Sequence, residues 1–277
     1  MTRERSRSFS PAACWVVLAA AITGCVQVPP PPGTPAPLGE QPRDRTTASD
    51  ETNNARRARV RMELATAYFS RGQLPTALDE VKQVLAIEPN LGEAYNLRGL
   101  IYSRMNDHEL AEDSFRRAIA INPRDGDALH NYGWHLCQRG RYQEAAEQFG
   151  QALAAPQYVG SLRTMLAQGV CEARSGNLLQ AEITLKRTYD LDPSNPVVAV
   201  NLAEVLLRRG DYERARFYIR RVNQTDDTSN AQTLWLAARI ERKLGNEQGV
   251  NDFGVKLRNR FPKSREALAF DRGAFDE

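Results

Sequence analysis

The sequence has few residues of the kinds that build catalytic and metal centres. It contains only 3 histidines and 4 cysteines among 277 residues. His130 and His135 are five residues apart, which is not the i, i+4 spacing of a helical metal pair, and no Cys/His cluster has zinc-ligand spacing. P-loop, G-x-G-x-x-G and G-x-S-x-G motifs are also missing. We therefore expect no enzyme, no metal and no cofactor, and interpret these histidines, with His108, as surface or packing residues.

A large net charge is missing as well. The formal charge of the whole chain is +3. Without residues 1–24 it would be +1, with 34 Lys and Arg against 33 Asp and Glu. A near-neutral chain has no broad electrostatic attraction for nucleic acid. We therefore expect no nucleic-acid partner.

The apolar segment near the N-terminus is too short to span a bilayer. It runs from about Pro11 to Thr23 behind three arginines, whereas a membrane span needs roughly 20 apolar residues. A basic start and a run of this length are typical of a signal peptide. The run ends in Ile-Thr-Gly-Cys at residues 22–25, which resembles the lipobox of bacterial lipoproteins. The resemblance implies cleavage after residue 24 and a lipid on Cys25; the alternative is an ordinary secretory signal.

Residues 25–55 are predicted to form a tether between the lipid and the folded part. Seven prolines lie between Pro29 and Pro42. Proline lacks an amide hydrogen and blocks helix interiors and central strands, so this segment is predicted to be an extended, disordered spacer. Val26 follows the cysteine. In Gram-negative lipoproteins an Asp there usually signals inner-membrane retention, so Val26 favours the outer membrane, facing the periplasm.

The rest of the chain repeats itself. A small residue, which is numbered repeat position 8, recurs at spacings of 34, 34, 36, 34 and 35, at Ala65, Gly99, Gly133, Gly169, Ala203 and Ala238. A second small residue follows twelve places later in five repeats, at Ala77, Ala111, Ala145, Ala181 and Ala215, with Val250 in the sixth. Between the two lies Gly72, Gly140, Gly176, Gly210 or Gly245, with Asn106 in the second repeat. Prolines close four repeats, at Pro89, Pro123, Pro193 and Pro262.

This pattern is similar to the tetratricopeptide (TPR) repeat. Two helices, A and B, cross closely where only Gly or Ala fits, the central Gly ends helix A, and Pro ends helix B. Larger residues, among them Leu64, Phe115 and Phe149, are predicted to fill the space around each crossing. The predicted fold is all-α: a right-handed superhelical solenoid of six TPR hairpins over 56–262, at 58–91, 92–125, 126–161, 162–195, 196–230 and 231–264, with a capping helix and tail in 263–277.

The two remaining cysteines of the folded part lie in neighbouring A helices. Cys137 and Cys171 occupy repeats three and four, and neighbouring A helices pack side by side. In an oxidising compartment they would form a structural disulfide. The alternative is two buried thiols that act as small apolar residues.

TPR ligands usually lie along the concave face, which the A helices line at repeat positions 2, 5, 6, 9, 12 and 13. The early repeats place apolar, aromatic and amide side chains there, which suits an extended or helical peptide. The alternative is that they belong to the core between repeats. The candidate partner-binding residues are Met62, Phe69, Asn96, Leu100, Arg104, His130, Asn131 and Trp134.

Residues 130–140, His-Asn-Tyr-Gly-Trp-His-Leu-Cys-Gln-Arg-Gly, resemble the N-Y-G-W-x-L-C segment of type IV pilus biogenesis lipoproteins of the PilW/PilF type. The lipobox, the proline tether and six repeats agree with that family. The resemblance implies a monomeric pilotin, anchored in the outer membrane, that binds the pilus secretin and promotes its localisation and multimerisation. It also implies paired cysteines and a ligand groove in the early repeats.

Two other functions fit a TPR chain. One is a lipoprotein that scaffolds cell-wall or outer-membrane biogenesis proteins. The other is an enzyme such as a peptidoglycan hydrolase, which requires an acid/base or nucleophile cluster that the sequence does not show.

Overall fold

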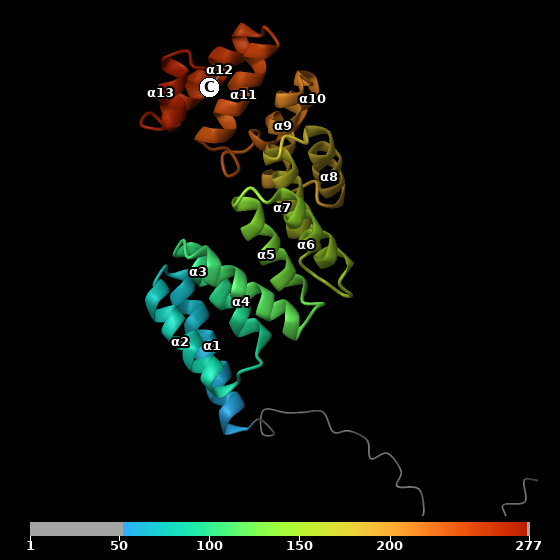
Figure 1. The fold of residues 1–277 in the computed structure, drawn as a ribbon. Coiled ribbons are helices and arrows are strands. Elements are labelled where there is room, and N and C mark those ends of the chain that lie inside the picture. The colour runs from blue at the N-terminus through green and yellow to red at the C-terminus, as the bar shows by residue number, and fades with distance from the viewer. Residues whose placement is uncertain (1–51, 276–277) are drawn as a thin grey trace, which may run out of the picture. The chain divides into compact units, whose positions relative to one another are not determined.

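A computed structural model of the chain describes residues 52–275. Within this range the chain forms 13 helices and no strand (Figure 1). The first twelve helices make six antiparallel pairs, and one short helix follows them. Their bounds are α1 (Asn53–Ser70), α2 (Leu74–Ile87), α3 (Gly92–Arg104), α4 (His108–Ile121), α5 (Gly126–Gln138), α6 (Tyr142–Ala154), α7 (Ser161–Arg174), α8 (Leu178–Leu191), α9 (Pro196–Arg209), α10 (Tyr212–Val222), α11 (Ala231–Lys243), α12 (Glu247–Arg260) and α13 (Arg265–Asp271).

The signal peptide predicted at 1–24, the lipidation site Cys25 and the tether up to residue 51 lie outside the described residues. Helix α1 begins at Asn53, where the Thr52 side chain accepts a hydrogen bond from the amide of Ala55. The last three residues of the predicted tether, 53–55, are therefore helical.

The turn inside each helix pair has the backbone conformation that the repeat pattern predicts. Five of these turns hold a glycine with φ between 72° and 86°. Asn106 takes the same place in the second pair with φ 61°, and Asn is the residue that tolerates this left-handed region best after Gly. The prolines that end repeats lie two residues after α2, α4, α8 and α12.

The small residues at repeat position 8 lie directly against the B helix of the same pair. A Cβ atom added to Gly99 would lie 2.6 Å from the Phe115 ring, and one added to Gly133 would lie 2.9 Å from the Phe149 ring. Both rings are fully buried. The close crossing therefore requires glycine wherever the opposing side chain is this large.

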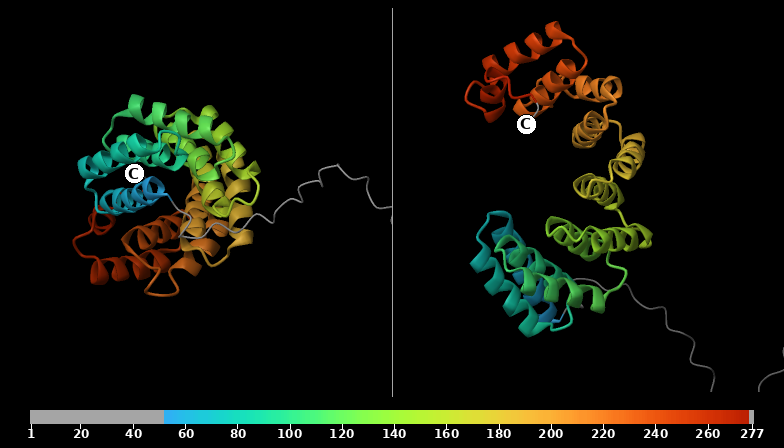
Figure 2. Two further views of the ribbon diagram at one scale, coloured as in Figure 1. Left: turned by 90° about the horizontal axis from the view of Figure 1, so that it is seen from below. Right: turned by 45° about the horizontal axis from the view of Figure 1, so that its top comes forward.

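Successive pairs stack into a right-handed superhelix, and the left view of Figure 2 shows the helices arranged in a ring. Each A helix packs on its own B helix and on the A helix of the next repeat. The connection between α6 and α7 is longer than those that follow α2, α4 and α8, and the connection between α10 and α11 is longer still. Between α6 and α7, Gln157 has φ 57°, and the Tyr158 hydroxyl lies 2.9 Å from the Thr164 hydroxyl.

The last helix pair is covered by α13, which packs on α11 and α12 and confirms the predicted cap. Its Phe270 ring lies over Gly254, where a Cβ atom would not fit. One packing prediction is wrong: Leu64 is 43% exposed. Leu64 lies at the edge of α1, and no preceding repeat among the described residues covers that edge.

Candidate functional site

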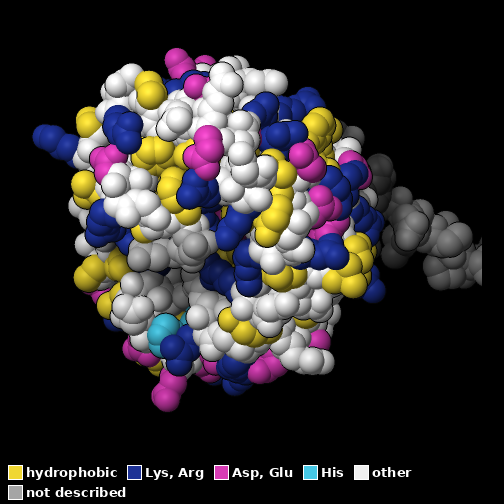
Figure 3. Space-filling view, turned by 90° about the horizontal axis from the view of Figure 1, so that it is seen from above, with side chains coloured by type: hydrophobic (Ala, Val, Ile, Leu, Met, Phe, Trp, Pro, Cys, Tyr) yellow, Lys and Arg dark blue, Asp and Glu magenta, His cyan; other side chains and the backbone are white. Residues whose placement is uncertain are grey.

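The candidate site is the A-helix face, which we define as the side chains at repeat positions 2, 5, 6, 9, 12 and 13 of α1, α3, α5, α7, α9 and α11. Those of them that are exposed or half-buried border the hollow of the superhelix, whereas buried ones such as Leu97 and Cys137 pack between helices. Figure 3 shows this hollow end-on, with Lys and Arg side chains gathered around its centre. At these positions the described residues carry twice as many basic side chains as acidic ones. The face is therefore electropositive.

Phe69 and Arg104 form one unit between repeats one and two. The guanidinium carbon of Arg104 lies 3.9 Å from the centroid of the Phe69 ring. The same guanidinium donates a hydrogen bond of 3.2 Å to the Phe69 carbonyl oxygen. Phe69 is half-buried and, with Met62, packs against the core of the first repeat. The ring therefore offers a partner only a part of its surface, next to a fixed positive charge.

Asn96 and Asn131 connect repeats two and three. The Asn131 amide donates a hydrogen bond of 3.1 Å to the Asn96 side-chain oxygen, and both residues are half-buried. This bond leaves the Asn96 amide hydrogens and the Asn131 side-chain oxygen available. A pair of free amide groups at the surface can bind the backbone of an extended peptide. Leu100 lies half-buried one turn after Asn96 and packs against the core of repeats two to four.

Trp134 is the largest side chain of this face in repeat three. It is half-buried, packs against the core of repeats two to four, and lies 5.0 Å from the guanidinium carbon of Arg174. The sequence left open whether Trp134 belongs to the core or to the groove. In the structure, one part of the Trp134 ring packs against the core and the rest is open to the groove.

His130 does not belong to the open face. It is 7% exposed, and its Nδ1 atom lies 2.9 Å from the Thr164 hydroxyl in the next repeat. Burial, and then the nearby Arg163 charge, lower its pKa to about 4. The prediction that His130 lines the groove is wrong, because α7 covers position 5 of α5. His130 instead packs between repeats three and four, the other role expected of a histidine.

Arginines at repeat position 13 link repeat two to repeat one and repeat five to repeat four. Arg208 donates a hydrogen bond of 3.0 Å to the carbonyl oxygen of Ala173, as Arg104 does to that of Phe69. Each therefore neutralises carbonyl groups at the C-terminal end of the preceding A helix, where a positive charge is favourable. Sequence analysis placed Arg104 among the groove residues but did not reveal this capping role.

The A-helix face of repeat six is occupied by the chain's own C-terminal segment. The Phe275 ring lies 5.0 Å from the Trp235 ring, and the Arg239 guanidinium donates a hydrogen bond of 3.3 Å to the Phe275 carbonyl oxygen. Arg242 lies 5.7 Å from the same ring. Sequence reasoning missed this contact, which leaves repeats one to five as the open part of the face.

Cys137 and Cys171 are joined by a disulfide in the structure, with Cα atoms 5.8 Å apart. Both cysteines are buried, at 2% and 3% exposure. The bond links α5 to α7, on either side of the connection between α6 and α7. Repeats three and four, which carry Trp134 and Arg174, are thereby held together.

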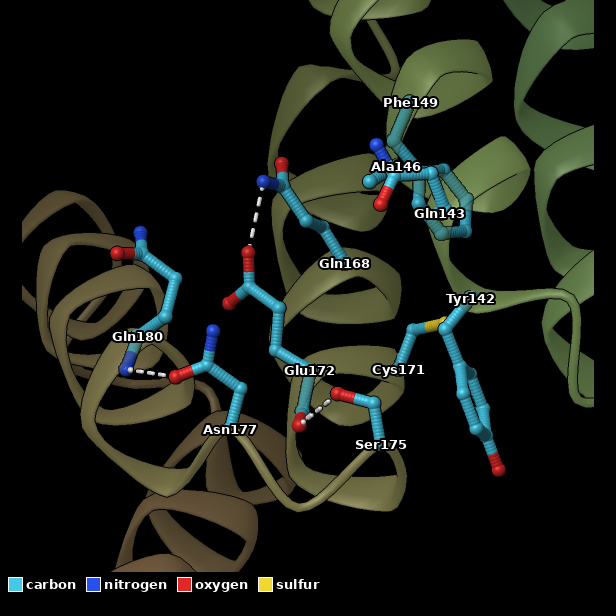
Figure 4. Close-up of a pocket in the computed structure, with 10 residues that line it drawn as sticks. All are labelled: Tyr142, Gln143, Ala146, Phe149, Gln168, Cys171, Glu172, Ser175, Asn177 and Gln180. Atoms are coloured by element: carbon cyan, nitrogen blue, oxygen red, sulfur yellow. Dashed lines mark hydrogen bonds between the residues drawn. The ribbon is translucent and has the colours of Figure 1, made fainter.

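A pocket of about 360 Å³ lies on the other side of α7 (Figure 4). Gln168 donates a hydrogen bond of 2.9 Å to the carboxylate of Glu172 there, and Asn177 begins the next helix beside it. Burial raises the pKa of Glu172, although its hydrogen bonds partly offset this. An α-helix turns 100° per residue, which places Gln168, Cys171 and Glu172 on the side of α7 opposite its groove residues. The pocket therefore faces away from the groove.

Within residues 52–275, no group of three or more His, Cys, Asp or Glu side chains is placed to hold a metal ion. In the same range no helix has both the length and the apolar character that a bilayer crossing requires.

Comparisons with known proteins agree with this architecture. The tetratricopeptide repeat family matches residues 92–125, 114–147 and 173–239. The type IV pilus assembly protein PilF of Pseudomonas aeruginosa is 25% identical over 260 residues, which are 94% of this chain and 97% of PilF. The crystal structure of PilW, described as a widely conserved type IV pilus biogenesis factor, has a TM-score of 0.72 and 29% identity, covering 76% of this chain and 97% of PilW. A structure of P. aeruginosa PilF has a TM-score of 0.68 and 23% identity, covering 80% of this chain and all of that one.

The helix pairs, their crossings and the repeat matches define a tetratricopeptide repeat protein. As a solenoid of this class, the chain is an interaction protein rather than an enzyme. It is a homologue of the type IV pilus biogenesis proteins PilF and PilW, as the segment at 130–140 predicted.

Proposed function

We propose that this chain is an outer-membrane lipoprotein that faces the periplasm, binds the secretin of the type IV pilus, and promotes its localisation and multimerisation. The observation that supports this most strongly is the similarity to a type IV pilus assembly protein over 94% of the chain. Cys25, the proposed lipid site, lies outside the described residues, so the anchor rests on the lipobox resemblance.

The A-helix face of repeats one to five is the proposed binding surface. It combines half-buried aromatic anchors, Phe69 and Trp134, with guanidinium groups and with free amides at Asn96 and Asn131. Aromatic anchors beside polar groups are typical of interface hot spots. On these five repeats the basic and acidic side chains are nearly balanced, at five to four, so the aromatic and amide groups favour a secretin segment with apolar side chains.

A pull-down tests the partner. The lipidated protein, extracted from the envelope in detergent, is expected to retain the secretin, and a strain that lacks it should assemble fewer secretin multimers and fewer pili. If the secretin does not co-purify and pili are normal, the proposal is wrong. Recovery of cell-wall or outer-membrane biogenesis proteins instead would support the scaffold alternative. A cross-linking probe at Asn96 in the native envelope would then identify the bound segment.

The binding surface is tested by Phe69→Ala combined with Leu100→Ala. We expect secretin binding to fall by at least roughly ten-fold, because buried anchors dominate interface energies. The matched control is Val255→Ala on α12, a 51% exposed apolar residue away from this face. If the double variant loses helicity, these residues act in the core. If it stays folded and binds normally, the A-helix face is not the site.

The membrane anchor is tested by Cys25→Ala. The variant cannot accept a lipid on a thiol, so it should leave the membrane fraction and lower pilus output. A variant that remains in the outer membrane would contradict the lipobox assignment without affecting the binding surface.

A further inference from the structure

At one exposed position of the B helices, repeats four and five differ from the other four repeats. At repeat position 22, which is exposed in every repeat, four repeats carry a carboxylate: Asp79, Asp113, Glu147 and Asp252. In α8 and α10 the same position holds Ile183 and Phe217, which are 54% and 61% exposed. The four acidic repeats show that the fold does not need an apolar side chain here. The two exceptions therefore require another explanation.

Two further exposed apolar residues lie on the same helix as Ile183. Leu179 lies one turn before Ile183 on α8 and is 58% exposed, and Leu191 is 60% exposed. Leu191 and Ile183 border a shared depression with Arg187. Single exposed apolar residues are ordinary, whereas clustered ones mark interaction sites. We call Leu179, Ile183, Leu191 and Phe217 the outer patch.

The two helices that carry the outer patch are direct neighbours. The Tyr189 ring of α8 meets the Tyr218 ring of α10 edge-on at 5.0 Å. The Arg214 guanidinium of α10 donates a hydrogen bond of 2.7 Å to Glu182 of α8. The patch residues therefore lie on adjacent helices of repeats four and five.

The charge around the outer patch is positive. Lys186 is paired with Asp190, and Arg220 with the buried Glu241. Arg187 and Arg221, however, have no ion pair with any described residue. Arg187 borders the depression beside Ile183 and Leu191, and Arg221 borders the one beside Phe217. Two unpaired guanidinium groups next to exposed apolar side chains complement a surface with carboxylates beside an apolar stripe.

We propose that the outer patch is a second docking surface, which binds an amphipathic helix of a partner protein with Glu or Asp beside its apolar stripe. A helix that lies along two neighbouring B helices would bury its apolar side chains against Ile183 and Phe217 and place carboxylates near Arg187 and Arg221. The patch belongs to B helices, whereas the A-helix face belongs to A helices. One chain can therefore hold two partner segments at once.

The test uses two synthetic helical peptides with the full-length chain. Both carry Leu at helical spacing; one has Glu at the flanking positions and the other has Lys. Fluorescence anisotropy should show that the Glu peptide binds and the Lys peptide does not. Ile183→Asp combined with Phe217→Asp, which restores the acidic row of the other repeats, should weaken binding by at least roughly ten-fold.

The matched control is Val255→Asp, which replaces a 51% exposed apolar residue on α12 and should leave binding unchanged. Arg187→Glu combined with Arg221→Glu should reverse the preference and make the Lys peptide the better ligand. Because all four side chains are exposed, helicity and melting temperature should not change. If the Asp variant unfolds, the charge-reversed variant decides the matter.

Three results would overturn the proposal. The first is equal affinity for the two peptides. The second is equal weakening by Val255→Asp, or by Phe69→Ala with Leu100→Ala, which would place the peptide elsewhere. The third is binding to phosphatidylglycerol vesicles through Ile183 and Phe217 without peptide binding, which would assign the patch to a lipid surface.

Discussion

Replacing Gly99 by alanine should destabilise the second repeat, although alanine is the better helix former. A Cβ atom at residue 99 would lie 2.6 Å from Cε1 of Phe115 and 2.7 Å from Cδ1. Phe115 is fully buried within the core of repeats two to four. The ring therefore has no free volume to move into, and α3 must move away from α4.

The magnitude follows from two opposing contributions. Overpacking a dense core by one methyl group typically costs about 1–3 kcal/mol. The higher helix propensity of alanine offsets this by about 1 kcal/mol. We therefore expect Gly99→Ala to lower the free energy of unfolding by about 1 kcal/mol, with an upper limit near ~2 kcal/mol.

Gly150 provides the matched control. It lies inside α6, is exposed, and has open space where a Cβ atom would be. Here only the propensity and entropy contributions remain, so Gly150→Ala should raise stability by about 0.5–1 kcal/mol. The same substitution therefore has opposite signs at the two sites.

The pairing of small and large residues allows a rescue experiment. Position 8 is glycine where the opposing residue is Phe115, Phe149 or Leu185, and alanine where it is Val81 or Ile219. Gly99→Ala with Phe115→Val recreates the pair of the first repeat. It should be less destabilised than the sum of its single variants, because contacting residues couple by about 0.5–3 kcal/mol.

Urea unfolding followed by circular dichroism measures all four variants against the unmodified chain. Repeat arrays can unfold in parts, so coincident transitions by fluorescence and circular dichroism must be checked first. If Gly99→Ala stabilises the chain as Gly150→Ala does, the close crossing does not explain the glycine. Strict additivity in the double variant would refute the pairing.

Three other predictions concern the centre of the solenoid. The pKa of His130, about 4 when folded, lies below its value of about 6.5 in the unfolded chain, so the unfolded state binds more protons between these limits. The contribution of His130 to stability should be complete above pH 6.5 and fall by roughly 3 kcal/mol toward pH 4; His130→Asn should lose this dependence in urea titrations, and an unchanged pH profile would contradict the burial argument. Thiol labelling of the denatured, unreduced chain should find neither Cys137 nor Cys171 free; reduction should lower stability by up to about 4 kcal/mol, whereas free thiols at both of these residues would rule out the bond. Arg208→Ala should lower the melting temperature more than Arg221→Ala, because only Arg208 caps a helix carbonyl in a neighbouring repeat; equal effects would contradict this role.

Much of the fold could be predicted because its determinants are local. Small residues at a fixed period, a left-handed residue in each turn, Asn106 included, and prolines after B helices each act within one helix pair. The candidate site was harder to predict. Phe69, Asn96 and Trp134 lie on the A-helix face as expected, but the burial of each depends on how closely the next repeat packs.

What the sequence determined by itself is therefore the number, order and crossing of the helix pairs, since these follow from backbone conformation and residue size over about 34 residues. Tertiary structure alone decided which side chains remain open. It buried His130 under α7, exposed Leu64 at an edge that no other repeat covers within residues 52–275, and placed Phe275 on Trp235. The physical reason is that accessibility depends on contacts between segments about 35 residues apart, whose spacing is set by every packed side chain between them.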